Sequence, residues 1–109
     1  HVEDLARACT YVMNLDKKTV DDAITPMQSH INVGVGSDIS IKNLALTMAK
    51  VTGFEGEIEF DTSKPDGTLR KLMDVSRLTQ MGWSAQIGLD QGLAETYQWF
   101  LANSETFRR

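Results

Sequence analysis

The chain has very little cysteine, no long apolar run and no basic block. Each of these absences excludes some classes of protein. Its 109 residues include one cysteine, Cys9, which excludes an internal disulfide framework and a cysteine-based zinc site. No apolar run approaches the roughly 20 residues that a membrane span needs, and no signal peptide is visible. The chain carries 15 acidic against 11 basic residues, so neither nucleic acid nor a membrane is an expected partner. The composition is that of one ordinary globular domain or of a part of one.

The first residues are already periodic in the manner of a helix. His1 to Ala6 lead straight into that helix, and no Met precedes them. Because a natural domain rarely begins inside an element, we expect a C-terminal piece of a longer protein.

Apolar periodicity predicts about four helices and two short strands, and therefore an α/β fold. The helices are expected over residues 1–15, 40–52, 74–81 and 89–103, and the strands over 31–35 and 57–61. Residues 16–28 are polar and aperiodic, which predicts a surface loop. Cys9 lies on the apolar stripe of the first helix and is expected to be a buried thiol. Since two strands alone make a marginal sheet, we expect a further region to complete it.

Catalytic and cofactor motifs are absent from the chain. His30 has no cysteine or acidic partner at ligand or triad spacing, so we expect a structural role for it and no metal site. Gly34 and Gly36 stand between a predicted strand and a predicted helix, as in a dinucleotide-binding turn. The third glycine of that fingerprint would fall at Ile39, so the motif fails and the glycines are expected to serve the turn.

The most informative segment is the loop from Lys64 to Lys71. It combines three cations, one carboxylate and a Pro-Asp-Gly turn within eight residues, directly after a predicted strand. Arg and Lys suit phosphates, and a carboxylate suits sugar hydroxyls. From spacing alone, both a ligand loop and a solvated turn with incidental charges remain open.

Five segments in order along the chain resemble a known family. They are His-Val-Glu-Asp-Leu-Ala from residue 1, Ser-His-Ile-Asn-Val-Gly from 29, residues 61–71 together with Asp74-Val75, Gly-Trp from 82 and Thr-Tyr-Gln-Trp-Phe-Leu from 96. The chain resembles the C-terminal third of the GDP-L-fucose synthase family, which belongs to the extended short-chain dehydrogenases/reductases. The resemblance implies that residues 1–109 form the C-terminal, substrate-binding part of a Rossmann-type fold. The N-terminal NADP-binding Rossmann part would then be absent from the chain.

The resemblance also implies an activity for the whole enzyme. The family converts GDP-4-keto-6-deoxy-D-mannose to GDP-L-fucose by 3,5-epimerisation and NADPH-dependent 4-reduction. Its Tyr-x-x-x-Lys motif is missing here, because Leu15 and Leu101 stand four residues after the two tyrosines. The resemblance therefore implies no catalytic or cofactor-binding residue in this chain, which is expected to be inactive alone. It assigns substrate binding to Asp66 at the nucleotide end and Lys71 at the diphosphate, with Arg70 and Lys64 as weaker candidates.

The implied partners are a GDP-sugar substrate and the Rossmann part, with NADP(H) bound by that part. The resemblance further implies a cytoplasmic homodimer. Two alternatives stay open: another nucleotide-sugar epimerase or dehydratase of the same superfamily, and a non-enzymatic interaction module.

Overall fold

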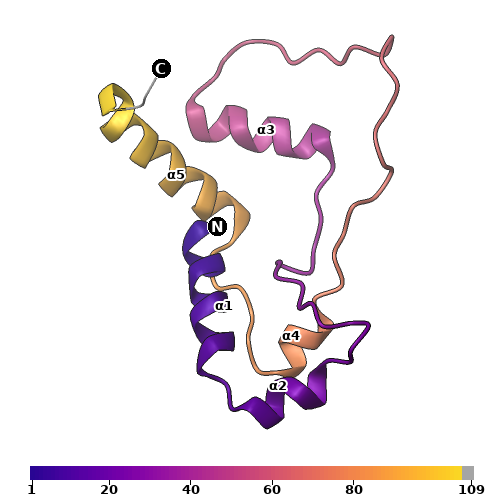
Figure 1. The fold of residues 1–109 in the computed structure, drawn as a ribbon. Coiled ribbons are helices and arrows are strands. Elements are labelled where there is room, and N and C mark those ends of the chain that lie inside the picture. The colour runs from indigo at the N-terminus through magenta and orange to yellow at the C-terminus, as the bar shows by residue number, and fades with distance from the viewer. Residues whose placement is uncertain (107–109) are drawn as a thin grey trace. The chain divides into compact units, whose positions relative to one another are not determined.

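The structure, a computed structural model, describes residues 1–106 and is mainly helical (Figure 1). Its α-helices are α1 (Val2–Asn14), α2 (Lys17–Ala23), α3 (Ile41–Thr52), α4 (Ser76–Gln80) and α5 (Leu89–Asn103), and a 3-10 helix, η1 (Ser104–Thr106), follows α5. None of the helices within residues 1–106 is both long and apolar enough to cross a bilayer.

The described chain divides into two compact units, each built from two separate stretches. Unit 1 consists of His1–Asp38 and Arg70–Gln86 and holds α1, α2 and α4. Unit 2 consists of Ile39–Leu69 and the residues from Ile87 onward, and holds α3 and α5.

Helix α1 is tied to the segment that follows α4, and this contact forms the centre of unit 1. The buried carboxylate of Asp4 accepts hydrogen bonds from the backbone N–H of Gln86 at 3.1 Å and from Nη2 of Arg7 at 2.8 Å. About two helical turns after Asp4, the hydroxyl of Tyr11 donates to the carbonyl of Met81 at 2.7 Å. Polar contacts therefore carry much of the attachment of α1.

A glycine, Gly82, follows the short helix α4 and ends it. Gly82 has a φ of 96°, and a Cβ at this position would lie 2.8 Å from the Tyr11 hydroxyl. A side chain would therefore be strained by the backbone conformation and would also collide with a side chain of α1. At the other end of the helix, the Asp74 carboxylate accepts from the backbone N–H of Ser76 at 2.9 Å.

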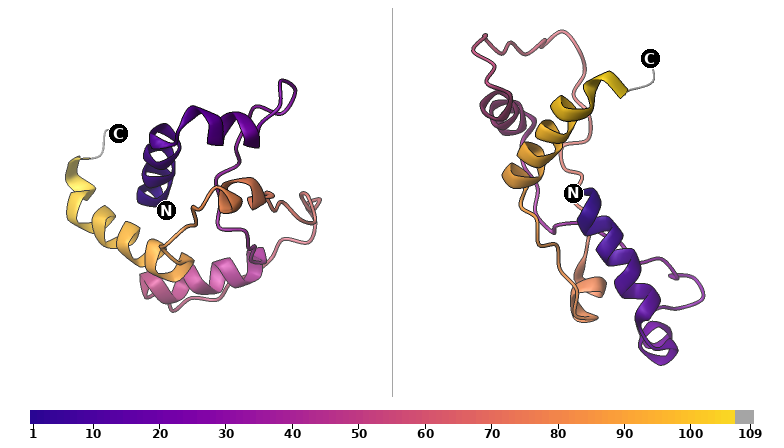
Figure 2. Two further views of the ribbon diagram at one scale, coloured as in Figure 1. Left: turned by 90° about the horizontal axis from the view of Figure 1, so that it is seen from below. Right: turned by 90° about the vertical axis from the view of Figure 1, so that its left-hand side faces the viewer.

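In unit 2, α3 contacts α5 (Figure 2). Both ends of α3 carry residue types that are common at helix caps. The Ser40 hydroxyl accepts from the backbone N–H of Asn43 at 3.1 Å, and Gly53 adopts the left-handed conformation at the other end. Helix α5 spans the predicted residues.

The two predicted strands are wrong for this chain. Within residues 1–106 no strand forms, and the only pairing is an isolated bridge between Thr25 and Gln28. Alternating apolar residues fit a strand, but a strand exists only when a neighbouring backbone accepts and donates its hydrogen bonds. The expected α/β fold is therefore corrected, for this stretch of chain, to a mainly helical one.

The predicted surface loop over 16–28 contains a helix, α2, that the apolar pattern did not reveal. Asp16 caps it, accepting from the backbone N–H of Thr19 at 2.9 Å. Ion pairs at i, i+4 spacing join Lys17 to Asp21 and Lys18 to Asp22 on its surface. The helix is thus supported by its cap and its charges, and no residue of it is buried.

The prediction that Cys9 is buried is also wrong here. Its side chain is exposed. The residues of α1 that are buried are Asp4 and Ala8, which lie on another face of the helix.

Candidate functional site

The predicted ligand loop is exposed and has neither helix nor strand from Lys64 to Lys71. An Asx turn precedes it, in which the Asp61 carboxylate accepts from the backbone N–H of Ser63 at 3.0 Å and from its hydroxyl at 2.6 Å. These hydrogen bonds, the side-chain one foremost, lower the pKa of Asp61 because they favour its charged form. A hydrogen-bonded turn in unit 2 therefore immediately precedes the loop.

Three of the predicted substrate-binding residues divide between the units. Asp66 lies in unit 2, while Arg70 and Lys71 lie at the start of the second stretch of unit 1. All three side chains are exposed. The structure therefore places Arg70 and Lys71 in one unit and Asp66 in the other.

The two basic residues of unit 1 differ in their surroundings. Nε of Arg70 donates to a carboxylate oxygen of Asp38 at 2.7 Å, and this contact raises the pKa of the guanidinium. Within residues 1–106, Lys71 forms no ion pair. An approaching anion therefore meets an uncompensated charge at Lys71 and a compensated one at Arg70.

The role of Asp38 was missed by sequence reasoning. Its partner Arg70 lies 32 residues away, and no local pattern links the two. Only the fold reveals that Asp38 neutralises one of the predicted ligand residues.

A second polar cluster surrounds Arg77 on α4. Its Nη1 donates to the carbonyls of Gln28, at 3.0 Å, and His30. Asn32 donates from its side-chain amide to the carbonyl of Asp74 at 3.0 Å. The stretch around His30 is thereby fixed through its backbone, which is a structural use of this segment.

Gly34 and Gly36 serve close packing against Val75. A Cβ at Gly36 would lie 2.9 Å from Cγ2 of Val75, and one at Gly34 would lie 3.3 Å from Cγ1. Neither glycine opens a helix directly, because α3 begins only at Ile41. The residues present do not build the phosphate-binding turn of a dinucleotide site.

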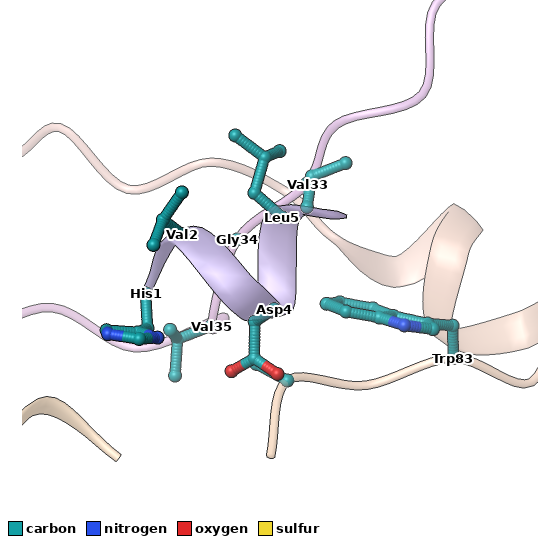
Figure 3. Close-up of a pocket in the computed structure, with 9 residues that line it drawn as sticks. His1, Val2, Asp4, Leu5, Val33, Gly34, Val35 and Trp83 are labelled. Atoms are coloured by element: carbon teal, nitrogen blue, oxygen red, sulfur yellow. The ribbon is translucent and has the colours of Figure 1, made fainter. Parts of the chain in front are cut away.

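A mainly apolar hollow of about 370 Å³ lies in unit 1, beside the start of α1 (Figure 3). Its lining includes Val2 and Leu5 from α1, Val33 and Val35 from the extended stretch, and the indole of Trp83. Within residues 1–106, no group of three or more His, Cys, Asp or Glu side chains is arranged to hold a metal ion. The hollow is therefore suited to apolar contacts rather than to binding a metal ion.

Comparisons with known proteins identify related chains, although no family model matches the sequence. The chain is 55% identical over 108 residues, 99% of its length, to the GDP-L-fucose synthase of Escherichia coli K12. It is 42% identical over 103 residues, 94% of its length, to GDP-L-fucose synthase 1 of Arabidopsis thaliana.

Solved structures agree in fold. A GDP-6-OMe-4-keto-L-xylo-heptose reductase from Campylobacter jejuni matches with a TM-score of 0.81 and 39% identity over 94% of this chain. A GDP-D-glycero-L-gluco-heptose synthase from the same organism, in the presence of NADPH, matches with a TM-score of 0.80 and 37% identity over 93%. The chain covers 30% and 28% of these two structures.

The chain spans about a third of the length of these relatives, with 34% of the E. coli protein and 29% of the Arabidopsis protein covered. The matching region of the solved structures is their C-terminal part. The chain is accordingly homologous to the C-terminal part of GDP-L-fucose synthase, among the GDP-sugar enzymes of the extended short-chain dehydrogenases/reductases.

Proposed function

We propose that residues 1–109 are the GDP-sugar-binding portion of a GDP-L-fucose synthase. The whole enzyme would convert GDP-4-keto-6-deoxy-D-mannose to GDP-L-fucose by 3,5-epimerisation and NADPH-dependent 4-reduction. The observation that carries this proposal is the 55% identity to the E. coli enzyme, which extends over 99% of the chain.

Within this portion, Asp66 is proposed to bind the nucleotide end of the substrate. A carboxylate accepts hydrogen bonds from ribose hydroxyls or from guanine N–H groups. Lys71 would bind the diphosphate, for which its uncompensated charge is suited. Arg70 would contribute less, because Asp38 already accepts from its guanidinium at 2.7 Å.

We assign the catalytic residues and the cofactor-binding site to the other two thirds of the enzyme. Two related C. jejuni structures are described with NADP bound or with NADPH present. In this chain the turn at Gly34 and Gly36 is closed by Val75, so the cofactor site would lie outside it. We therefore propose that the chain alone is inactive and that the longer enzyme works as a cytoplasmic homodimer.

A chimaera tests the proposal directly. Residues 1–109 would replace the matching third of the E. coli enzyme, and NADPH oxidation would be followed with GDP-4-keto-6-deoxy-D-mannose. We expect turnover in the chimaera, none from the isolated chain, and calorimetric binding of GDP in preference to UDP. A correctly folded chimaera that binds NADPH but does not recognise GDP would contradict the proposal.

A second candidate has a specific observation behind it. The chain is 38% identical over 101 residues to the GDP-L-colitose synthase of Yersinia pseudotuberculosis, and two of the solved relatives are a GDP-heptose reductase and a GDP-heptose synthase. Assaying the chimaera with the corresponding 4-keto sugars, all linked to GDP, separates these substrates. An interaction module without a ligand would be indifferent to every nucleotide tested.

A further inference from the structure

Two faces of helix α1 have the character expected from their surroundings: one packs inside unit 1 and the other is polar and faces water. The face formed by Asp4, Ala8 and Tyr11 points into unit 1, where Asp4 and Ala8 are buried and Tyr11 bonds to Met81. A second face is polar and exposed or partly exposed, as expected beside water. It consists of Glu3, Arg7, Thr10 and Asn14.

A third face of α1 is apolar and largely uncovered by the rest of residues 1–106. It consists of Val2, Leu5, Cys9 and Met13, which we call the α1 apolar stripe. Their spacing of three or four residues places them along one side of the helix. Val2 is 73% exposed, Leu5 52% and Met13 83%, and Cys9 is exposed as well. A helix with water on this side would carry polar residues here, as it does on its polar face.

The stripe continues into the apolar hollow of unit 1. Val2 and Leu5 belong to both, and Val33, Val35 and Trp83 extend the apolar surface beyond the helix (Figure 3). A contiguous surface of this kind marks a contact with another polypeptide.

The total exposed area of the chain is larger than that of compact bodies of the same mass. Two separate compact bodies, each with half of the chain's 12.1 kDa, would together expose about 7,300 Å². The chain exposes 9227 Å². The excess of about 1,900 Å² exceeds what one partner of a standard protein–protein interface buries, about 800 Å².

We infer that the α1 apolar stripe and the adjoining hollow are the surface on which the cofactor-binding part of the longer enzyme packs. This inference rests on the proposed function, because that part is the two thirds of the E. coli relative that this chain does not cover. A covalently joined part is present at an effective concentration of the order of millimolar, so it outcompetes a second copy for the same surface.

Cys9 provides a direct measurement, because it lies in the middle of the stripe and is the only cysteine of the chain. The rate of its reaction with N-ethylmaleimide would be followed by peptide mass spectrometry in the isolated chain and in the chimaera. We expect labelling to slow at least tenfold in the chimaera. The matched control is Thr10→Cys in a Cys9→Ser background, on the polar face, which should label equally fast in both proteins.

A pair of substitutions gives a second measurement. Met13→Glu places a charge on the stripe, and Asn14→Glu places the same charge on the polar face of the same turn. In the chimaera, Met13→Glu should lower the Tm by several degrees, while Asn14→Glu should leave it nearly unchanged. In the isolated chain both side chains face solvent, so the two variants should behave alike.

Three outcomes would overturn the inference. Labelling of Cys9 in the chimaera as fast as that of Thr10→Cys would show an uncovered stripe. Protection that already appears in the isolated chain and rises with its concentration would assign the surface to a second copy. A chimaera that fails to fold, when the parent E. coli enzyme folds, would show that the surfaces do not match. Turnover and GDP binding are measured separately from labelling. Protection of Cys9 in a chimaera that does not recognise GDP would contradict the proposed function but would still support the docking surface.

Discussion

Asp66 stands in an exposed loop and forms no ion pair within residues 1–106. In the chimaera, Asp66→Ala should raise the KM for the GDP-sugar roughly ten- to hundredfold, because a hydrogen bond to a charged group contributes about 1.5–3 kcal/mol. Steady-state kinetics measure the KM. Asp66→Asn keeps part of the acceptor capacity, so its KM should lie between those of the unsubstituted chimaera and Asp66→Ala. An unchanged KM in Asp66→Ala would remove this residue from the site.

The two basic residues at the start of the second stretch of unit 1 should respond differently to substitution. Lys71→Ala should weaken GDP binding in the chimaera more than Arg70→Ala, since Arg70 is already paired with Asp38 at 2.7 Å. Calorimetry with GDP and with NADPH provides the measurement. Equal weakening of both ligands by Lys71→Ala would indicate misfolding rather than lost recognition.

At the residue scale, the sequence predicts what local chemistry determines. The caps of α3 at Ser40 and Gly53, and the positive φ of Gly82, follow from the residue types alone. The pairing of Asp38 with Arg70 and the burial of Asp4 depend on segments brought together from far along the chain, and no spacing rule indicates them.

Among the elements, α2 depends on a charged cap and should therefore respond to acid. Hydrogen bonds from Thr19, with the side-chain bond the largest cause, lower the pKa of Asp16. Because the folded pKa lies below the unfolded one, the cap's contribution is complete above about pH 4 and disappears as the pH falls through the folded pKa. Amide NMR of residues 17–23 should show α2 fraying in acid. Asp16→Asn, which caps without titrating, should remove most of this acid dependence.

The end of α4 packs against α1 at Gly82. A side chain at this position should therefore lower the stability of the protein. Gly82→Ala combines a φ of 96° with a contact of 2.8 Å to the Tyr11 hydroxyl. The cost should be about 1–3 kcal/mol, seen as a lower Tm of the chimaera. Tyr11→Phe relieves the contact but loses the hydrogen bond to Met81, so alone it should cost about 1 kcal/mol. If Gly82→Ala left the Tm unchanged, the packing of α1 on this turn would be wrong.

The accuracy of the element predictions follows from where each element finds its hydrogen-bond partners. Helices bond within themselves, so their caps and apolar periods located α1, α3 and α5 well. The stretches 31–35 and 57–61 have the alternation of strands, but no backbone segment among the described residues 1–106 pairs with them. Helix α2 escaped prediction because no apolar face marks it.

On the scale of the whole chain, the large exposed area has a spectroscopic consequence. The fluorescence of the dye ANS, which reports accessible apolar surface, should rise strongly with the isolated chain and fall in the chimaera. Among residues 1–106, eighteen large apolar residues are substantially exposed and only three apolar residues are buried, which leaves ample surface for the dye. Equal ANS fluorescence per mole in the two proteins would argue that this surface stays uncovered in the enzyme.

The ion pair of Asp38 and Arg70 also has a consequence for the connectivity of the molecule. It joins the last residue of the first stretch of unit 1 to the first residue of its second stretch, with 2.7 Å between the side-chain atoms. No single uninterrupted segment of the gene encodes unit 1, so truncation at either end cannot isolate it. A short glycine–serine bridge from Asp38 to Arg70, replacing residues 39–69, would yield unit 1 as one minimal polypeptide ending at Gln86. The pair therefore marks the position at which an engineered gene can join the two ends.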